Sequence, residues 1–377
     1  MNLSFINLDF GFILNQIFSK LNNGFYSKNM DLNKMDIEAL GFQGGGVKGL
    51  AYIGALRKLE IYGMRLNRIK RFSGTSSGSQ IAALIAVGYT VDELETIFYS
   101  MPFHKSNNTT SFGILRNIHR LIWSYGFYKG KFITKLIDTL ITDKTGHTKT
   151  TFNELFEKRG VVLRITGTCL STRELAYFDY KVSPHMPICK AVQISSCVPL
   201  LYAAVKYEGK YYVDGAILRN LPIKSFPENK TLFLKFKETE IDKLNNHHNI
   251  GNILKFIYSI IDTTSKFCND LSITEALHTL QDNIRIIEID TYIVKVSEFA
   301  INYKTKMFLI KQGEHAVTEY IQNVWRLKII QENRLRELIY VKKLEYTSKE
   351  MERLERQHSD LKSKNIELQQ SCRIVDW

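Results

Sequence analysis

The stretch IEALGFQGGGVKGL at residues 37–50 decides how this chain is expected to fold. Its first part, Ile37–Phe42, is short and apolar and predicts a β-strand, whereas Leu50–Leu59 has apolar residues at helical spacing. The glycines between these elements offer consecutive backbone N–H groups that no side chain covers, and the dipole of the following helix adds positive potential. The sequence therefore predicts an oxyanion hole at Gly44, Gly45 and Gly46.

A second glycine-flanked segment, GTSSG at Gly74–Gly78, follows a predicted strand at Ile69–Ser73 and precedes a predicted apolar helix at Gln80–Val87. It has the G-x-S-x-G form, in which a serine occupies a sharp strand-to-helix turn and small residues let the backbone close tightly. Ser76 has a glycine two positions before it and two positions after it, unlike the neighbouring serines. We therefore expect Ser76 to be the nucleophile of a serine hydrolase, with Gly74 and Gly78 shaping the turn.

The glycine-rich segment also resembles two nucleotide-binding patterns. A dinucleotide-binding fold expects an acidic residue about 20 positions later to bind the ribose, but no Asp or Glu occurs between Glu60 and Asp92. The missing acidic residue disfavours NAD. NADP stays open, because nearby basic residues could bind its 2′-phosphate, but the G-x-S-x-G motif at Gly74–Gly78 would then be a coincidence. Those basic residues are Arg68, Lys70 and Arg71. A P-loop is disfavoured because Val47 follows the glycines where Lys is required.

The nucleophile needs a base, for which the sequence offers two kinds of candidate. An α/β-hydrolase would use a downstream histidine, but none of these follows a predicted strand beside a glycine. They are His247, His248, His278, His315 and His358. Asp214 is better placed, because it ends the apolar run Tyr211–Val213 and precedes Gly215, so that a sharp turn would present its carboxylate at the edge of a sheet.

Further strands are predicted at Val161–Thr166 and Lys210–Val213, and another helix at Val91–Tyr99. Thr90 is the expected N-cap of this helix, because Glu93 follows it at the spacing of a capping box. Alternating strands and helices predict an α/β fold, with a mainly parallel central sheet covered by helices on both faces.

We divide the chain into an apolar N-terminal segment at residues 1–36, a catalytic domain at residues 37–227 and a mostly helical C-terminal region at residues 228–377. Met101–Thr150 is helical and aromatic, and is interpreted as helix core, with an acyl-binding wall or lid as the alternative. The C-terminal region begins with polar residues and an apolar helix predicted at Ile250–Ile261.

After Gly313 the chain contains neither Pro nor Gly. Leucines recur there at a seven-residue spacing, but the positions that precede them include polar residues, and the repeat is too short to establish a coiled coil. The leucines are Leu354, Leu361 and Leu368, and the preceding positions are Met351, His358 and Asn365. We expect a solvated terminal helix that a partner could also bind.

The net charge of +13 invites a nucleic-acid interpretation, but no zinc-finger, RNP or basic-zipper pattern accompanies it. We therefore expect no nucleic acid, and a solvated basic surface, notably at residues 57–71, that would be attracted to anionic lipid headgroups. The five cysteines lack CxxC pairing, which indicates neither a disulfide framework nor a zinc ribbon and fits a reducing compartment.

The first thirty residues are apolar and aromatic, but the first basic residue is Lys20, so that the positive start of a signal peptide is missing. No run reaches the roughly 18 to 20 apolar residues that a membrane span needs. An interfacial amphipathic helix and a helix docked on the core are equally compatible with the segment. These observations predict a cytoplasmic protein that associates peripherally with membranes.

Together these motifs resemble those of the patatin-like phospholipases. The resemblance rests on the glycine-rich loop at Gly44–Gly49, the elbow at Gly74–Gly78 and the D-G-A sequence at Asp214–Ala216, in that order. The GFYKG sequence at Gly126–Gly130 and the SSCVP sequence at Ser195–Pro199 add to it. It covers about residues 37–227.

The resemblance implies a three-layer fold and a Ser-Asp dyad, in which Asp214 activates Ser76 directly and the amides of Gly45 and Gly46 hold the oxyanion. Lys48 stands where many members of the family carry arginine. This difference keeps the positive charge but loses the planar fork, so that a role of Lys48 in binding an anion stays open.

The implied activity is hydrolysis of acyl esters of glycerophospholipids, with no metal and no cofactor. Lysophospholipids, neutral lipids and transacylation are alternatives, and so is a catalytically idle membrane-binding or scaffold protein. A free aspartate is a weak base at neutral pH. We therefore expect Asp214 to be mostly buried, with a raised pKa, and to lie within hydrogen-bond reach, about 2.6 to 3.2 Å, of the Ser76 hydroxyl.

Overall fold

The computed structural model describes residues 37–100, 125–227, 230–238, 251–280, 284–292, 294 and 301–372. The chain forms two compact units, Met1–Thr318 and Glu319–Trp377, each of which is described by itself. The predictions for the N-terminal segment, for residues 101–124 and for His247 and His248 lie outside the described residues.

The first unit is built on a mixed sheet whose parallel part has the strand order β10-β9-β1-β2-β4. These strands are β1 (Ala39–Phe42), β2 (Arg71–Gly74), β4 (Val162–Cys169), β9 (Thr231–Phe236) and β10 (Arg285–Ile289). Antiparallel strands complete the sheet, since β5 and β8 both pair with β4, and β7 pairs with β8. They are β5 (Glu174–Phe178), β7 (Val205–Tyr207) and β8 (Lys210–Asp214). The predicted α/β fold with a mainly parallel sheet is confirmed.

The sheet continues beyond residue 227. β9 pairs with β1 and β10 pairs with β9, so that two strands of the region expected to be mostly helical belong to the parallel sheet. These two strands were not predicted from the sequence.

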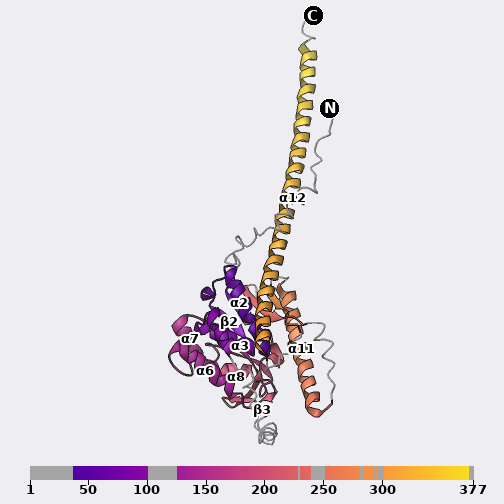
Figure 1. The fold of residues 1–377 in the computed structure, drawn as a ribbon. Coiled ribbons are helices and arrows are strands. Elements are labelled where there is room, and N and C mark those ends of the chain that lie inside the picture. Colours follow the sequence, from indigo (N-terminus) through magenta and orange to yellow (C-terminus); the bar gives the residue numbers. More distant parts are fainter. Residues whose placement is uncertain are drawn as a thin grey trace. The chain divides into compact units, whose positions relative to one another are not determined.

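Helices cover both faces of the sheet (Figure 1). Thr166 and Gly167 are adjacent in β4 and therefore face opposite sides. A Cβ atom on Gly167 would touch Ile194 of α8 (Ile188–Ser195), whereas a Cβ atom on Gly215 would collide with Thr166. Gly215 is the N-cap of α9 (Ala216–Arg219), and α11 (Ile253–Leu280) packs against α9. The sheet thus lies between α8 on one side and α9 with α11 on the other.

Further helices of the first unit include three that lie where helices were predicted: α2 (Ala51–Ile61), α3 (Ser77–Val87) and α4 (Val91–Ser100). α6 (Lys131–Thr145) falls in the stretch expected to be helical, whereas η2 (Gly46–Leu50), η3 (Leu66–Arg68) and α7 (Phe152–Arg159) were not predicted. A small separate sheet pairs β3 (Gly126–Tyr128) with β6 (Leu200–Tyr202).

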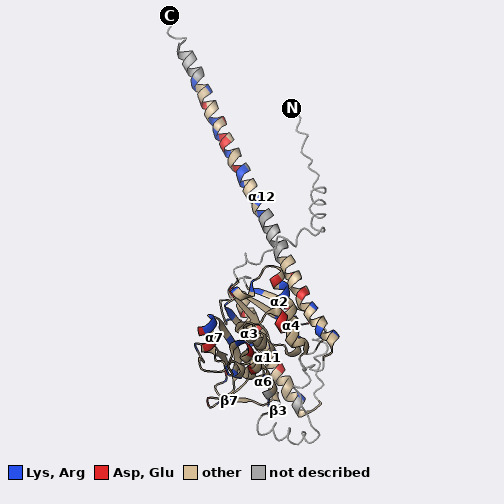
Figure 2. Ribbon diagram, turned by 60° about the vertical axis from the view of Figure 1, so that its left-hand side comes forward, with Lys and Arg blue, Asp and Glu red and all other residues tan. Residues whose placement is uncertain are grey.

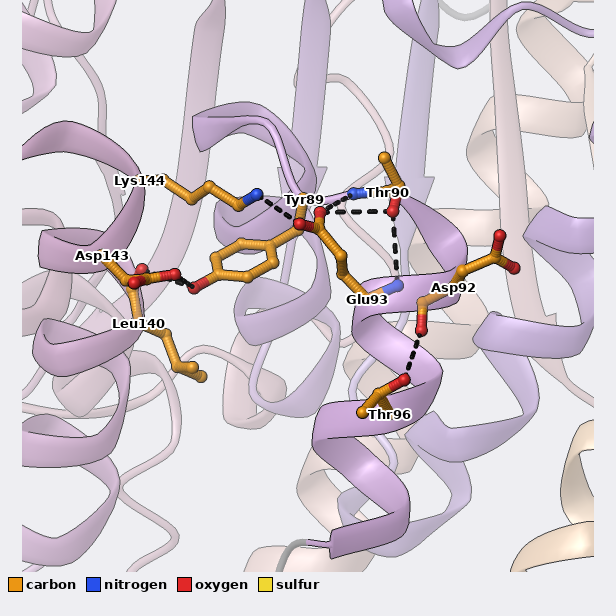
Figure 3. Close-up of polar contacts among 8 residues, drawn as sticks. All are labelled: Tyr89, Thr90, Asp92, Glu93, Thr96, Leu140, Asp143 and Lys144. Carbon is orange, nitrogen blue, oxygen red and sulfur yellow. Dashed lines mark hydrogen bonds and ion pairs between the residues drawn. The ribbon is translucent and has the colours of Figure 1, made fainter.

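The start of α4 forms the predicted capping box (Figure 3). The Glu93 N–H donates to Thr90 Oγ1 over 3.3 Å, and the Thr90 N–H donates to Glu93 Oε2 over 2.9 Å. The same carboxylate pairs with Lys144 of α6 at 2.6 Å, and Tyr89 donates to Asp143 of α6 over 3.1 Å. The cap therefore also ties α4 to α6.

The first turns of α12 (Tyr303–Cys372), up to Thr318, pack against α2 within the first unit. Two glycines permit this close approach, because a Cβ atom on Gly54 would collide with the carbonyl of Ile310, and one on Gly313 with the carbonyl of Ala51. An ion pair of 3.1 Å between Arg57 and Glu314 joins the same two helices.

The second unit continues as α12 to Cys372. Met351, Leu354, His358 and Leu361 are exposed there, while the side chains of Asn365 and Leu368 are outside the description. A solvated helix stays the prediction for this unit. No helix in the described part of the chain has the length and apolar character that crossing a membrane would require.

Candidate active site

Ser76 lies between β2 and α3, at the turn predicted from the sequence. Its φ of 51° and ψ of −123° place it outside the regions that residues other than glycine normally occupy. The turn closes tightly, because a Cβ atom on Gly74 would collide with the carbonyl of Gly78, and one on Gly78 with the carbonyl of Phe42. The strained backbone projects the Ser76 side chain away from the strand and into a cavity.

Asp214 reaches Ser76 because β2 and β8 meet end to end along one edge of β4. In the register, β2 ends with Gly74 opposite Ile165, and β8 ends with Asp214 opposite Gly167. Both strands lie on the edge of β4 that β5 does not occupy. The sequence predicted the turn after β8 but not its antiparallel direction, which is what brings its end to the end of β2.

Asp214 is only 2 % exposed. Its Oδ1 accepts a hydrogen bond of 2.9 Å from the Ala216 N–H, whereas its Oδ2 is buried and has no hydrogen-bond partner of standard geometry among the described residues. Burial raises the pKa of Asp214 to about 7, against the opposing effects of the Ala216 amide and of the nearby Ser76 hydroxyl. The carboxyl is thus enclosed and has a raised pKa, as predicted, but the expected hydrogen bond to Ser76 is not formed with standard geometry.

One short segment holds the backbones of both residues. The Ser76 N–H donates to Ser195 Oγ over 2.9 Å, and the Asp214 N–H donates to the Cys197 carbonyl over 2.9 Å. Ser195 and Cys197 are both buried. The sequence of this segment resembles a family motif, but this supporting role was not predicted.

The three predicted oxyanion-hole amides differ in this structure. The Gly44 N–H donates to Asn220 Oδ1 over 2.9 Å, and the Gly45 N–H donates to Ser77 Oγ over 3.0 Å. Gly46 opens η2, and its N–H has no acceptor among the described residues, as expected for the first amide of a helix. Two of the three donors are therefore engaged, and Gly46 is available.

Ser76, Asp214 and the glycine loop line a single cavity of about 300 Å³. Much of the remaining wall is apolar, including Phe98, Leu136, Leu201 and Ile261. Phe132 also lines it, which supports the acyl-wall alternative for this part of the aromatic stretch.

No histidine, lysine or arginine of the described residues lines this cavity. Lys48 is buried but is not part of the wall, so the geometry gives no support to the suggestion that it binds an anion. Over the same described ranges, no group of three or more His, Cys, Asp or Glu side chains is arranged to hold a metal ion.

Helix α11 forms part of the cavity wall, which was not predicted from the sequence. Tyr258, Ile261, Asp262 and Ser265 line the cavity. The sequence predicted a helix here, but an apolar helix gives no sign of where it packs. The one available signal was a pair of small polar residues, Ser265 and Asn269, spaced by one helical turn.

These two polar residues bind the turn that follows Asp214. Ser265 Oγ donates to the Ala216 carbonyl over 2.5 Å, and Asn269 Nδ2 donates to the same carbonyl over 3.1 Å. Asn269 Oδ1 accepts from the Asn220 N–H, and Asn220 in turn holds the Gly44 amide. α11 is therefore connected to both the turn that follows Asp214 and the glycine loop.

The sequence and the fold of this chain are similar to those of known proteins. Residues 40–227 match the sequence model of the Patatin family, described as patatin-like phospholipase. An uncharacterized protein of Acanthamoeba polyphaga mimivirus is 28 % identical over 296 residues, which are 77 % of this chain and 95 % of that protein. A probable lipid hydrolase of Invertebrate iridescent virus 6 is 30 % identical over 191 residues, which are 49 % of this chain and 62 % of that protein.

Among solved structures, VipD from Legionella pneumophila superposes with a TM-score of 0.51 at 17 % sequence identity, over 76 % of this chain and 67 % of VipD. This likeness concerns the fold alone. The family match shows that the chain belongs to the patatin-like phospholipase family. The chain is accordingly an ester hydrolase.

Proposed function

We propose that this enzyme is a phospholipase A-type lipid acyl hydrolase in which Ser76 is the nucleophile and Asp214 is the base. One observation carries the proposal: a serine on a strained turn and a buried carboxyl with a pKa of about 7 line the same largely apolar cavity. A base whose pKa lies near the working pH suits proton transfer. The family match supports lipid acyl esters as the substrate class.

In the proposed mechanism, Ser76 Oγ attacks the acyl carbonyl carbon while its proton passes to Asp214 Oδ2. Negative charge develops on the carbonyl oxygen, and the Gly46 N–H donates to it. The tetrahedral intermediate collapses, the ester C–O bond breaks, and the leaving lysolipid oxygen takes the proton from Asp214. The acyl group is then bound to Ser76.

Water completes the proposed cycle. It attacks the acyl-serine carbonyl and gives a proton to Asp214, and the fatty acid leaves when Ser76 Oγ recovers that proton. The Gly45 N–H can join the oxyanion hole only when the Ser77 hydroxyl releases it. Gly44 has a different role in this proposal, because its bond to Asn220 fixes the loop.

The cavity favours the acyl chain over the headgroup as the part of the substrate that its walls recognise. Apolar residues such as Phe98 and Leu136 can enclose hydrocarbon, whereas no described lysine or arginine lines the cavity to hold a phosphate. We propose that the enzyme works at a membrane surface and is peripheral to it. A lipid panel with different headgroups and labelled sn-1 or sn-2 chains would define the preference.

The test measures fatty-acid release from mixed phospholipid vesicles. Asp214→Asn should lower kcat by about 10²- to 10⁴-fold, the usual contribution of a general base. Ser76→Ala should remove hydrolysis and covalent labelling by a fluorophosphonate. Ser359→Ala and Asp360→Asn are matched controls, because both residues are exposed in the second unit. Undiminished hydrolysis by Ser76→Ala or Asp214→Asn would reject the dyad, and a wild type that neither hydrolyses lipid nor labels would indicate an idle scaffold.

A further inference from the structure

Helix α11 carries large apolar side chains that face away from the protein. They are each between 46 and 68 % exposed. At about 100° of rotation per residue, they fall within an arc of about 60° on the helix. We call these residues the outer stripe of α11: Ile253, Phe256, Ile260, Phe267 and Leu271.

The opposite face of α11 is anchored on the protein. Ser272 and Ala276 are buried there, and Ala276 belongs to an apolar cluster with Phe233 of β9. Ser265 and Asn269 on this face bind the turn that follows Asp214. The helix is therefore docked through one face, and its outer stripe is left to solvent.

The outer stripe contains no charged residue. Between Ile253 and Leu271, the charged residues of α11 all lie outside the 60° arc of the outer stripe: Lys255, Asp262, Lys266 and Asp270. Figure 2 shows the helix as mostly tan, the colour of residues that are neither acidic nor basic. A protein partner usually contributes polar contacts and a polar rim, whereas a narrow, uncharged apolar stripe matches the hydrocarbon of a lipid layer.

The outer stripe also lies close to the active-site cavity, because the same helix lines that cavity with Tyr258 and Ile261. An interfacial helix sinks its apolar face about 5–10 Å into the headgroup and acyl boundary. A helix is about 10 Å across, so a lipid layer on the outer stripe would lie within one helix diameter of the cavity. A substrate that leaves the bilayer would then have a short path to Ser76.

We propose that the outer stripe of α11 docks this enzyme on the surface of a phospholipid bilayer by inserting into the boundary between headgroups and acyl chains. The inference rests on the proposed function, since it supplies the surface from which the substrate comes. Apolar insertion does not need lipid charge, so that binding to zwitterionic vesicles should persist when salt is raised.

The test separates docking from chemistry. Binding is measured by co-sedimentation with phosphatidylcholine vesicles in a Ser76→Ala background, in which no lipid is consumed. Ile260→Ser, Phe267→Ser and Leu271→Ser are combined, and affinity should fall by at least about tenfold. The matched control combines Ile61→Ser and Val182→Ser, because both residues are 65 % exposed apolar residues on other elements. The control should bind like its parent.

Activity gives the second readout, with Ser76 restored. The stripe variant should hydrolyse vesicle phospholipid at least about tenfold more slowly, while a short water-soluble p-nitrophenyl ester is cleaved at the wild-type rate, which also shows that the variant is folded. Unchanged vesicle binding by the stripe variant overturns the proposal, as does a parent that does not bind vesicles. If light scattering showed that the parent is a dimer and the stripe variant is not, while vesicle binding was unchanged, the outer stripe would instead be a contact with a second copy of this chain. Hydrolysis by Ser76→Ala would reject the dyad and leave the binding result standing.

Discussion

The centre of the sheet and helix α11 line the same cavity, but the surroundings of their residues differ. Around Ser76 and Asp214 the backbone is held by buried neighbours, such as Ser195 and the Cys197 carbonyl. α11 is fixed on its inner face and leaves large apolar side chains exposed on its outer face. The difference agrees with the proposed division of roles, in which the centre positions the nucleophile and base and the helix contacts the lipid that supplies the substrate.

The largest predicted effect is on the stability of the folded protein, through the buried carboxyl of Asp214. Asp214 keeps its proton in the folded state up to about pH 7, but an unfolded aspartate loses it near 3.8. The folded state therefore binds more protons between these values, and the free energy of unfolding should fall as pH rises through this window. Asp214→Asn removes this loss, so its free energy of unfolding at pH 8 should exceed that of wild type by up to about 4 kcal/mol.

Urea denaturation at pH 4 and pH 8 measures the free energies of unfolding, with Asp360→Asn as the control for an exposed carboxyl. The stability gained by Asp214→Asn over wild type should shrink toward zero at pH 4. In the wild type, kcat/KM should rise with pH and level off above about 7, because the ionised Asp214 carboxylate is the proposed base. If wild type and Asp214→Asn had equal free energies of unfolding at pH 8, burial of the ionised Asp214 carboxylate would not destabilise the folded state.

Much of the centre could be predicted from local sequence. The strands before Gly44 and Ser76, the helices after them and the capping box at Thr90 each follow from a pattern within a few residues. The position of Asp214 in a turn after a strand was also predictable. The direction of β8 was not, because apolar strands carry no local signal that distinguishes parallel from antiparallel pairing.

What the sequence did not reveal depends on contacts between distant residues. The Gly44 amide is engaged by Asn220, and the place of α11 on the cavity depends on its contacts with α9. β9 and β10 lie beyond the matched motifs, although β9 is the neighbour of β1. Whether Lys48 could bind an anion in the site was also not decided by the sequence, and depended on its burial and its absence from the cavity wall.

The next effect tests whether the elbow needs its buried support. Ser195→Ala would leave the Ser76 N–H without its acceptor at a residue that already has a strained backbone. Losing one partner of a buried hydrogen bond costs about 1–3 kcal/mol. We expect kcat to fall by about tenfold, which corresponds to about 1.4 kcal/mol, with KM nearly unchanged, because Ser195 positions Ser76 without forming part of the cavity wall.

Steady-state kinetics on a soluble ester and the rate of fluorophosphonate labelling both report this change. Ser359→Ala serves as the exposed serine control. If Ser195→Ala raised KM and left kcat and labelling alone, the residue would shape the cavity and not the nucleophile.

The smallest effect concerns Asn269, which joins the two regions. Asn269→Ala would remove the acceptor of the Asn220 N–H and one donor to the Ala216 carbonyl, although Ser265 would still bind that carbonyl. Because Ser265 still donates to the Ala216 carbonyl, we expect kcat to fall only about threefold and the free energy of unfolding to fall by about 1 kcal/mol.

Asn269→Asp separates the two bonds, since a carboxylate still accepts from the Asn220 N–H but cannot donate to Ala216. If the link to Asn220 and the glycine loop matters for chemistry, the Asp variant should retain most of the wild-type kcat and the Ala variant should not. Equal losses in both would instead place the effect at the Ala216 turn that follows Asp214. Wild-type kcat in both would mean that α11 contributes to the cavity only as part of its wall and does not position the proposed catalytic residues.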